Sequence, residues 1–325
     1  MKLTNRRLAS FSMLVVLSIV MISVNLSKRE DAILVDGGSK KLKNKPTSVK
    51  APVDLTESPK EEDKHLTSFL IIFVASKPDN VRERRAIRTT WARGYTNSHT
   101  KVVVRFAMGT DGLNETMINL LHRESSREGD IIFLPDLYEH YNNLTRKTMR
   151  IFQWTTANAT VAYLMKVDDN SYLRINTILT FLQNRNSTKC LYLGNISWKA
   201  KPVQNTSSKA KNIEMNWHLG EHYLPYARGP GYILSYELVK IITESNDKLS
   251  VHFYQAEDVS VGVWVAPFDV EYFDASDTFL IKSKQFKLCG NNTMLMHPQT
   301  FTSMQRTYDR FVKTGLLCEP KLLNS

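Results

Sequence analysis

The chain has 325 residues, of which 23% are charged, and its formal net charge is +11 at pH 7. This length accommodates a short leader and either one large domain or two small ones. The dense basic cluster at Arg82, Arg84, Arg85 and Arg88 has no interleaved aromatic residues. That pattern argues against a nucleic-acid surface and favours a phosphate-bearing or otherwise acidic small ligand.

An uncharged stretch covers residues 8–27, LASFSMLVVLSIVMISVNLS, and follows Lys2, Arg6 and Arg7. A stretch of this length can just span a bilayer core as a helix. The positive charge on its N-terminal side predicts a cytoplasmic tail over residues 1–7. We therefore expect a retained signal anchor, one N-terminal transmembrane helix. A cleaved signal peptide is the alternative, but Ser-Val-Asn-Leu-Ser is a poor cleavage site.

Residues 28–66 are rich in Lys, Glu, Ser, Pro and Gly, as expected of a luminal stem. An ordered domain would then follow at residues 67–325 in the secretory lumen. An excess of Asn-x-Ser/Thr acceptors fits that compartment. These predicted glycosylation sites are Asn114, Asn143, Asn158, Asn186, Asn195, Asn205 and Asn291. In an oxidising compartment Cys289 and Cys318 can close a disulfide, which leaves Cys190 as a buried free thiol.

From residue 69 onward, apolar runs alternate with amphipathic segments. The run Phe69–Ser76 predicts a fully buried strand, and Asp79 or Asn80 can cap a helix that continues to Trp91. Further strands are predicted at 101–109, 130–136 and 162–169, and further helices at 114–127, 144–159 and 175–185. This order predicts an α/β fold with a parallel sheet and helices on both faces. Ligands bind at the carboxyl ends of such strands, where Asp136 and the triplet Asp168-Asp169-Asn170 are expected.

The alternation breaks up after Cys190. Residues 197–217 are polar and irregular, which suggests an excursion on the substrate side. A Gly-Pro-Gly sequence then precedes an apolar run and a helix predicted at 236–245. Glu257 and Asp258 come just before another apolar stretch.

Two acidic groups could carry chemistry. Asp168, Asp169 and Asn170 offer the hard oxygen ligands that Mn²⁺ and Mg²⁺ prefer, although a turn is the alternative. Glu257 and Asp258 could divide the roles of base and orienting neighbour, although acids also favour a helix start. Arg84 and Arg88 would lie one helical turn apart, where they either bind an anion or form internal ion pairs.

Five motifs occur in order behind the anchor: RRAIRTTW at 84–91, YNNLTRKT at 141–148, KVDDN at 166–170, GYILS at 231–235 and EDVSVG at 257–262. Together they resemble the β-1,3-galactosyltransferase family of Golgi glycosyltransferases, and the likeness extends from Ser68 to Cys318. The resemblance implies a GT-A fold, which is Rossmann-like with a mostly parallel sheet. It also implies UDP-galactose as donor, Mn²⁺ or Mg²⁺ as cofactor, and a single-pass type II protein of the Golgi membrane with a luminal catalytic domain.

The same motifs imply roles for individual residues. Asp258 matches the base of an inverting transferase, with Glu257 beside it, and His297 matches a C-terminal histidine that joins Asp168 and Asn170 in the metal shell. The positions that match the donor site are Arg84, Arg85, Arg88, Asp136, Lys147, Lys166, Asp168 and Asp169. The chain departs from the family pattern in two places: Asn170 stands where Asp is usual, and Pro230 interrupts the glycine run before GYILS.

Residues 222–235 and 257–270, and the ending Cys289…His297…Cys318, resemble the family members that build the glycosaminoglycan–protein linker. This implies a galactosyl-β-1,4-xylosyl-serine acceptor on proteoglycan core proteins, and association with other linker glycosyltransferases. One alternative is β-1,3 transfer of galactose or N-acetylglucosamine to a glycolipid or N-glycan. Another is a catalytically lapsed member that binds a glycan or a partner.

Overall fold

The computed structural model describes residues 65–95, 101–185, 187, 189–202 and 220–318. The predicted anchor at 8–27 and the stem up to residue 64 lie outside these ranges. Within the described ranges, no helix has both the length and the apolar character needed to cross a membrane.

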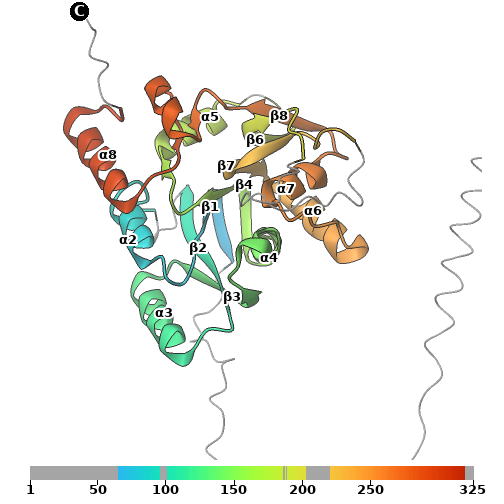
Figure 1. The fold of residues 1–325 in the computed structure, drawn as a ribbon, viewed down its shortest axis with the longest axis horizontal. Helices are drawn as coiled ribbons and strands as arrows, with labels where there is room; N and C mark the ends of the chain where they lie inside the picture. Colours follow the sequence, from blue (N-terminus) through green and yellow to red (C-terminus); the bar gives the residue numbers. More distant parts are fainter. Residues whose placement is uncertain (1–64, 96–100, 186, 188, 203–219, 319–325) are drawn as a thin grey trace, which may run out of the picture. The chain divides into compact units, whose positions relative to one another are not determined.

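A seven-stranded sheet forms the centre of the structure, with the strand order β3-β2-β1-β4-β7-β6-β8 (Figure 1). Its strands are β1 (Leu66–Ala75), β2 (Val102–Asp111), β3 (Ile131–Tyr138), β4 (Ala159–Asp168), β6 (Cys190–Ser197), β7 (Tyr226–Ser235) and β8 (Val270–Asp274). The strands β1 to β4 pair in parallel, and β6 pairs in parallel with β8. Strand β7 runs antiparallel to both of its neighbours, β4 and β6.

Helices cover both faces of this sheet, because side chains of a buried strand alternate between the faces. On one face Leu70 and Ile72 of β1 share a core with α2, α3, α5 and α8, and on the other Ile71 and Phe73 share a core with α4, α6 and α7. The helices are α2 (Val81–Thr89), α3 (Glu115–Glu128), α4 (Leu144–Asn158), α5 (Ile175–Gln183), α6 (Tyr236–Leu249), α7 (Glu257–Val265) and α8 (Phe301–Thr314). Figure 1 shows α2 beside α8, and α6 beside α7.

A second, three-stranded sheet brings the C-terminal region to the end of β4. Its order is β5-β10-β9, where β5 is Tyr172–Leu173, β9 is Phe279–Leu280 and β10 is Leu295–Met296. The amide of Gln299 also donates a 2.7 Å hydrogen bond to the carbonyl of Asn170. The segment that holds His297 is therefore fixed against the segment that follows Asp168.

The first half of the structure confirms the predicted alternation of four strands and four helices. The second half departs from it, because β6, β7 and β8 extend the sheet and β7 reverses its direction. The sheet is consequently mixed and mostly parallel. Cys289 and Cys318 form a disulfide with Cα atoms 5.9 Å apart. Cys190 is a free thiol and is only partly buried.

Candidate active site

Lys166 joins two acidic groups at the carboxyl end of β4. Residues i and i+2 of a strand share a face, so Lys166 and Asp168 point the same way. The Lys166 ammonium donates to Asp168 Oδ1 at 2.7 Å and to the carbonyl of Gly229 at 2.9 Å, and lies 3.4 Å from Glu257 Oε2. Burial opposes its charge, but the carboxylates of Asp168 and Glu257 outweigh burial and raise the pKa of Lys166.

Glu257 is the first residue of α7 and is buried beneath this corner. Its Oε1 accepts hydrogen bonds from the hydroxyls of Tyr232 at 2.5 Å and Thr148 at 2.8 Å. Tyr232 lies opposite Lys166 in the antiparallel β4–β7 pair. Because three groups donate to Glu257, its carboxylate is a structural anion that ties α4, α7 and the sheet together.

Asp258, the next residue of α7, carries the second carboxyl group and is partly buried. Its Oδ2 accepts from the amide of Gly229 and its Oδ1 from the amide of Val259, each at 3.0 Å. Burial and the charge of Glu257 raise the pKa of Asp258 to about 6. A carboxyl group with this pKa, held in place by backbone amides, suits a general base that works near neutral pH.

The three predicted metal ligands lie on the two segments that the small sheet joins. Asp168 ends β4 with a side chain 35% exposed, and His297 Nδ1 lies 3.2 Å from the hydroxyl of Ser171, which leaves Nε2 for another contact. Burial lowers the pKa of His297, which favours the neutral imidazole that metals bind. A carboxylate, an amide oxygen and an imidazole fit Mn²⁺ or Mg²⁺ as donors. Among the described residues, no three His, Cys, Asp or Glu side chains form a metal cluster.

Asp169 points away from Asp168 toward α2, where its Oδ2 accepts a 2.8 Å hydrogen bond from Asn80. This contact ties the end of β4 to the loop after β1. Trp91 stabilises the turn that follows Asp169, because its indole nitrogen donates to the carbonyl of Ser171 at 3.0 Å.

Arg84 and Arg88 form internal ion pairs, which was the alternative to ligand binding. The Arg84 side chain is fully buried, and all five of its N–H donors are used: two by Glu124 and three by Ser76, Lys77 and Pro78. Arg88 pairs with both Glu124 and Asp130. Every N–H group of Arg84 is thus hydrogen-bonded within the protein, which argues against the predicted contact of Arg84 with the sugar nucleotide. Arg84 shapes the loop after β1 instead.

The other residues predicted to bind the sugar nucleotide do not lie together in the structure. The Lys147 ammonium is buried under the loop after β1, where it donates to the carbonyl of Ser76 and to Glu139, each at 2.5 Å. Asp136 does not join this group, because β3 continues to Tyr138 and the exposed Asp136 pairs with Arg150 on the surface. Glu139 occupies the position expected of Asp136. Arg85 is exposed on α2.

Sequence reasoning missed Tyr141, which lies in the short turn before α4 and is 52% exposed. Partial burial and the negative charges of Asp258, Asp168 and Glu257 raise the pKa of its phenol. The Tyr141 phenol is therefore within electrostatic range of these three carboxyl groups. Its position at the start of the YNNLTRKT motif was the available signal.

The predicted glycosylation sites differ in accessibility. Asn114 and Asn291 are exposed, and Asn143 and Asn158 are partly buried. Asn195 is buried in the folded protein, and its amide nitrogen, to which a glycan would attach, donates to the carbonyl of Phe279. Asn186 and Asn205 lie outside the described residues.

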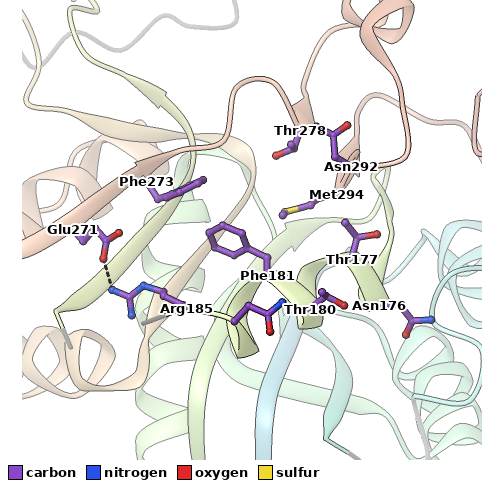
Figure 2. A pocket seen from close by; sticks show the side chains of 11 residues that line it. Asn176, Thr177, Thr180, Phe181, Arg185, Glu271, Phe273, Thr278, Asn292 and Met294 are labelled. Carbon is purple, nitrogen blue, oxygen red and sulfur yellow. Dashed lines mark hydrogen bonds and ion pairs between the residues drawn. The ribbon is translucent and has the colours of Figure 1, made fainter. Parts of the chain in front are cut away.

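A groove of about 740 Å³ lies elsewhere, between α5 and β8 (Figure 2). Phe181 and Phe273 line it and meet edge to face, and Arg185, another lining residue, pairs with Glu271. It shares no residue with the corner formed by Asp168, Glu257 and Asp258, so it does not mark the reaction centre.

Comparison with known proteins assigns the chain to a family. A model described as galactosyltransferase matches residues 82–276. Beta-1,3-galactosyltransferase 6 of Mus musculus is 33% identical over 257 residues, covering 78% of this chain and 76% of the relative. A hydroxyproline O-galactosyltransferase of Arabidopsis thaliana is 31% identical, covering 77% of this chain and 36% of the relative. A lactosylceramide 1,3-N-acetyl-beta-D-glucosaminyltransferase of Danio rerio is 30% identical, covering 60% of this chain and 53% of the relative.

Among solved structures, a galactosyltransferase determined with donor and acceptor sugar analogues is matched over 78% of this chain and 98% of that one, with 12% identity and a TM-score of 0.38. The chain belongs to the galactosyltransferase family. It is a hexosyltransferase of the β-1,3-galactosyltransferase type.

Proposed function

We propose that this protein transfers galactose from UDP-galactose, with inversion, to the galactosyl-β-1,4-xylosyl-serine linker of proteoglycan core proteins, as galactosyltransferase II does. The observation that carries the proposal is the position of Asp258. Its carboxyl group, with a pKa of about 6, stands at the start of α7 beside the Asp168 corner at the end of β4.

The chemical step is a single displacement. Asp258 removes the proton from the 3-hydroxyl of the acceptor galactose, and that oxygen forms a bond to the anomeric carbon of the donor. The bond between this carbon and the diphosphate oxygen breaks, and UDP leaves with the electron pair. Glu257 holds Asp258 in the ionisation range of a base through its charge, and the amide of Gly229 aims the carboxylate.

The leaving group develops negative charge near the end of β4. Asp168, Asn170 and His297 would hold a divalent cation there, and such an ion neutralises the charge of a leaving diphosphate. Asn170 offers an oxygen ligand but no charge, so we propose weaker cation binding than an Asp at this position would give. The buried ammonium of Lys166 keeps Asp168 oriented.

We also propose that the protein is a single-pass type II protein of the Golgi membrane, anchored by residues 8–27. The uncharged stretch and the flanking Lys2, Arg6 and Arg7 support this topology. The exposed sequons Asn114 and Asn291 and the Cys289–Cys318 disulfide support a luminal catalytic domain. Association with other transferases of linker synthesis is part of the same proposal.

The relatives differ in the acceptors that their names state. One is named for hydroxyproline and another for lactosylceramide with an N-acetylglucosamine donor. The second candidate function is therefore β-1,3 transfer of galactose or N-acetylglucosamine to a glycolipid or N-glycan. The alternative of a catalytically inactive family member that only binds a glycan or a partner is disfavoured, because this chain retains Glu257, Asp258 and His297.

A donor and acceptor panel tests the proposal. The purified luminal domain would be incubated with radiolabelled UDP-galactose or UDP-N-acetylglucosamine and with a galactosyl-β-1,4-xyloside, a hydroxyproline peptide, lactosylceramide or an N-glycan. Transfer of galactose to the galactosyl-xyloside, with product of β-1,3 linkage, is expected. Preferential transfer to another acceptor would replace the linker assignment, and the absence of transfer with every pair would favour the lapsed member.

A further inference from the structure

Gly262 closes the EDVSVG motif and lies on α7 one helical turn after Asp258. It is inside the helix, where alanine would be the better helix former. Residues four apart share one face of a helix, and both Gly262 and Asp258 meet β7. A glycine at such a position is expected where another backbone approaches closely.

The backbone of Gly262 packs against the start of β7 without room for a side chain. A Cβ atom here would lie 2.5 Å from Tyr226 Cβ, 2.6 Å from the carbonyl oxygen of Pro225 and 3.1 Å from Tyr226 Cα. Non-bonded carbon atoms rest about 3.5 to 4.0 Å apart, so a methyl group needs roughly 1 Å more separation. Rotation of the Tyr226 side chain cannot supply it, because none of these three atoms moves in that rotation.

The start of β7 is held in place, so α7 would have to move. Tyr226 and Ala227 pair with the end of β6. The amide of Ala227 also donates a 2.8 Å hydrogen bond to the hydroxyl of Tyr192, whose ring is fully buried. A methyl group on residue 262 would therefore push α7 away from the sheet.

The same contact between helix and strand brings the proposed base to its amide donor. One turn back along α7, Asp258 Oδ2 accepts a 3.0 Å hydrogen bond from the amide of Gly229. A further separation of about 1 Å would exceed the range of an N–H···O hydrogen bond. A side chain at Gly229 would begin 3.5 Å from Oδ2, which is an ordinary contact. Of the two glycines, Gly262 is therefore the one that limits how closely α7 and β7 pack.

We propose that Gly262 is a positioning residue for the base. Its lack of a side chain lets α7 pack closely enough against β7 for the Gly229 amide to bind and aim the Asp258 carboxylate. This role rests on the proposed function of Asp258 as the base, but not on the identity of the acceptor.

The test measures galactose transfer by Gly262→Ala with UDP-galactose and the best acceptor from the panel. We expect kcat to fall about 10- to 100-fold, because a misplacement of about 1 Å is enough to disturb a catalytic group to that extent. The KM for UDP-galactose should stay within about twofold of the wild-type value, since the added methyl group meets the start of β7 and not the end of β4.

The pH profile of kcat/KM separates aim of the base from folding. Burial and the charge of Glu257 raise the pKa of Asp258 to about 6, and the Gly229 amide is the strongest of the groups that oppose this rise. Loss of that hydrogen bond raises the pKa further, so Asp258 loses its proton only at higher pH. The acidic limb should therefore move to higher pH in Gly262→Ala.

The other ionisable groups near Asp258 do not titrate at this limb. The ammonium of Lys166 and the guanidinium of Arg228, on β4 and β7, keep their charge there. Burial raises the pKa of each phenol that interacts with Asp258 above its ordinary value, so these phenols remain neutral near pH 6: Tyr141, Tyr192 and Tyr226.

Val261→Ala is the matched control, because Val261 is a fully buried residue of the same helix. It should lower the unfolding midpoint without adding a group against β7, and leave kcat and the acidic limb close to the wild type. A wild-type kcat or an unmoved limb in Gly262→Ala would overturn the positioning role. So would an equal movement of the limb in Val261→Ala, or a Gly262→Ala protein that circular dichroism shows to be unfolded, since Gly262 would then serve the fold alone.

Failure of the proposed base gives a different result. If Asp258→Asn, assayed in parallel, retains wild-type kcat, Asp258 is not the base and the positioning role falls with it. If Asp258→Asn loses activity while Gly262→Ala behaves as the wild type, only the positioning role is wrong. A chain that transfers to no acceptor has no base to position, which overturns both proposals.

Discussion

The hydroxyl of Tyr232 donates a 2.5 Å hydrogen bond to Glu257 Oε1, in the interface between β7 and α7. This bond holds a buried charge directly beside the proposed base. Glu257 thereby raises the pKa of Asp258, second only to burial. The acidic pair thus divides into Glu257, which is buried and hydrogen-bonded, and Asp258, whose pKa is raised to about 6.

Replacing Glu257 by Gln should move the acidic limb of the pH profile of kcat/KM to lower pH. The limb is expected near pH 6 in the wild type, because Asp258 must lose its proton to act as a base and has a pKa of about 6. A neutral Gln removes the repulsion that raises this pKa. Tyr232→Phe is the control, since it removes the hydrogen bond to Glu257 but keeps the Glu257 carboxylate. The acidic limb of its pH profile should not move to lower pH. A limb that stays in place in Glu257→Gln would mean that Glu257 does not tune the base.

Replacing Asn170 by Asp should lower the Mn²⁺ concentration needed for half-maximal activity. The substitution adds a negative charge at a position proposed to bind the cation, and hard divalent ions bind carboxylates more strongly than amides. Asp169→Asn is the control, because Asp169 is committed to Asn80 and should affect cation binding little. An identical Mn²⁺ dependence in Asn170→Asp and the wild type would exclude Asn170 from the cation site.

Replacing Arg84 by Met should lower the free energy of unfolding by about 3 to 5 kcal/mol, because it leaves Glu124 with an incompletely paired buried charge. The side chains of this pair are 0% and 6% exposed and lie 2.7 Å apart. Urea unfolding at neutral pH measures the change. The exposed neighbour Arg85 is the control, and Arg85→Ala should stay within about 0.5 kcal/mol of the wild type. If Arg84→Met kept wild-type stability but lost affinity for UDP, donor binding and not loop support would be its role.

The outcome for these arginines shows where prediction from sequence reaches its limit. The sequence places Arg84 and Arg88 on one helix face, and both ion pairing and phosphate binding satisfy that pattern. Glu124 and Asp130, which decide the question, lie 36 to 42 residues away and are brought in by packing of α3 and β3. Local patterns cannot supply such contacts.

The fold was predictable where strands are continuous apolar runs, as in Phe69–Ser76 and Ala162–Asp169. Strand β7 was not, because Gly229-Pro230-Gly231 reads as a turn yet lies inside the strand. Pro230 is tolerated there, and Gly231 is closely packed, since a side chain at this position would begin 2.6 Å from the end of the Leu295 side chain and would displace it. The acidic motifs of the site were visible in the sequence, whereas Glu139 was not, because a single acidic residue outside a motif carries no local signal.

The most direct test of the account measures galactose transfer by Asp258→Asn with UDP-galactose and the best acceptor from the panel. We expect kcat to fall by about 10²- to 10⁴-fold, because the amide cannot accept the acceptor proton. Affinity for UDP, measured by calorimetry, should stay close to the wild-type value, since the Asp258 carboxylate accepts its hydrogen bonds from the backbone amides of Gly229 and Val259. A variant that retained wild-type kcat, with the same product linkage, would contradict the assignment of Asp258 as the base.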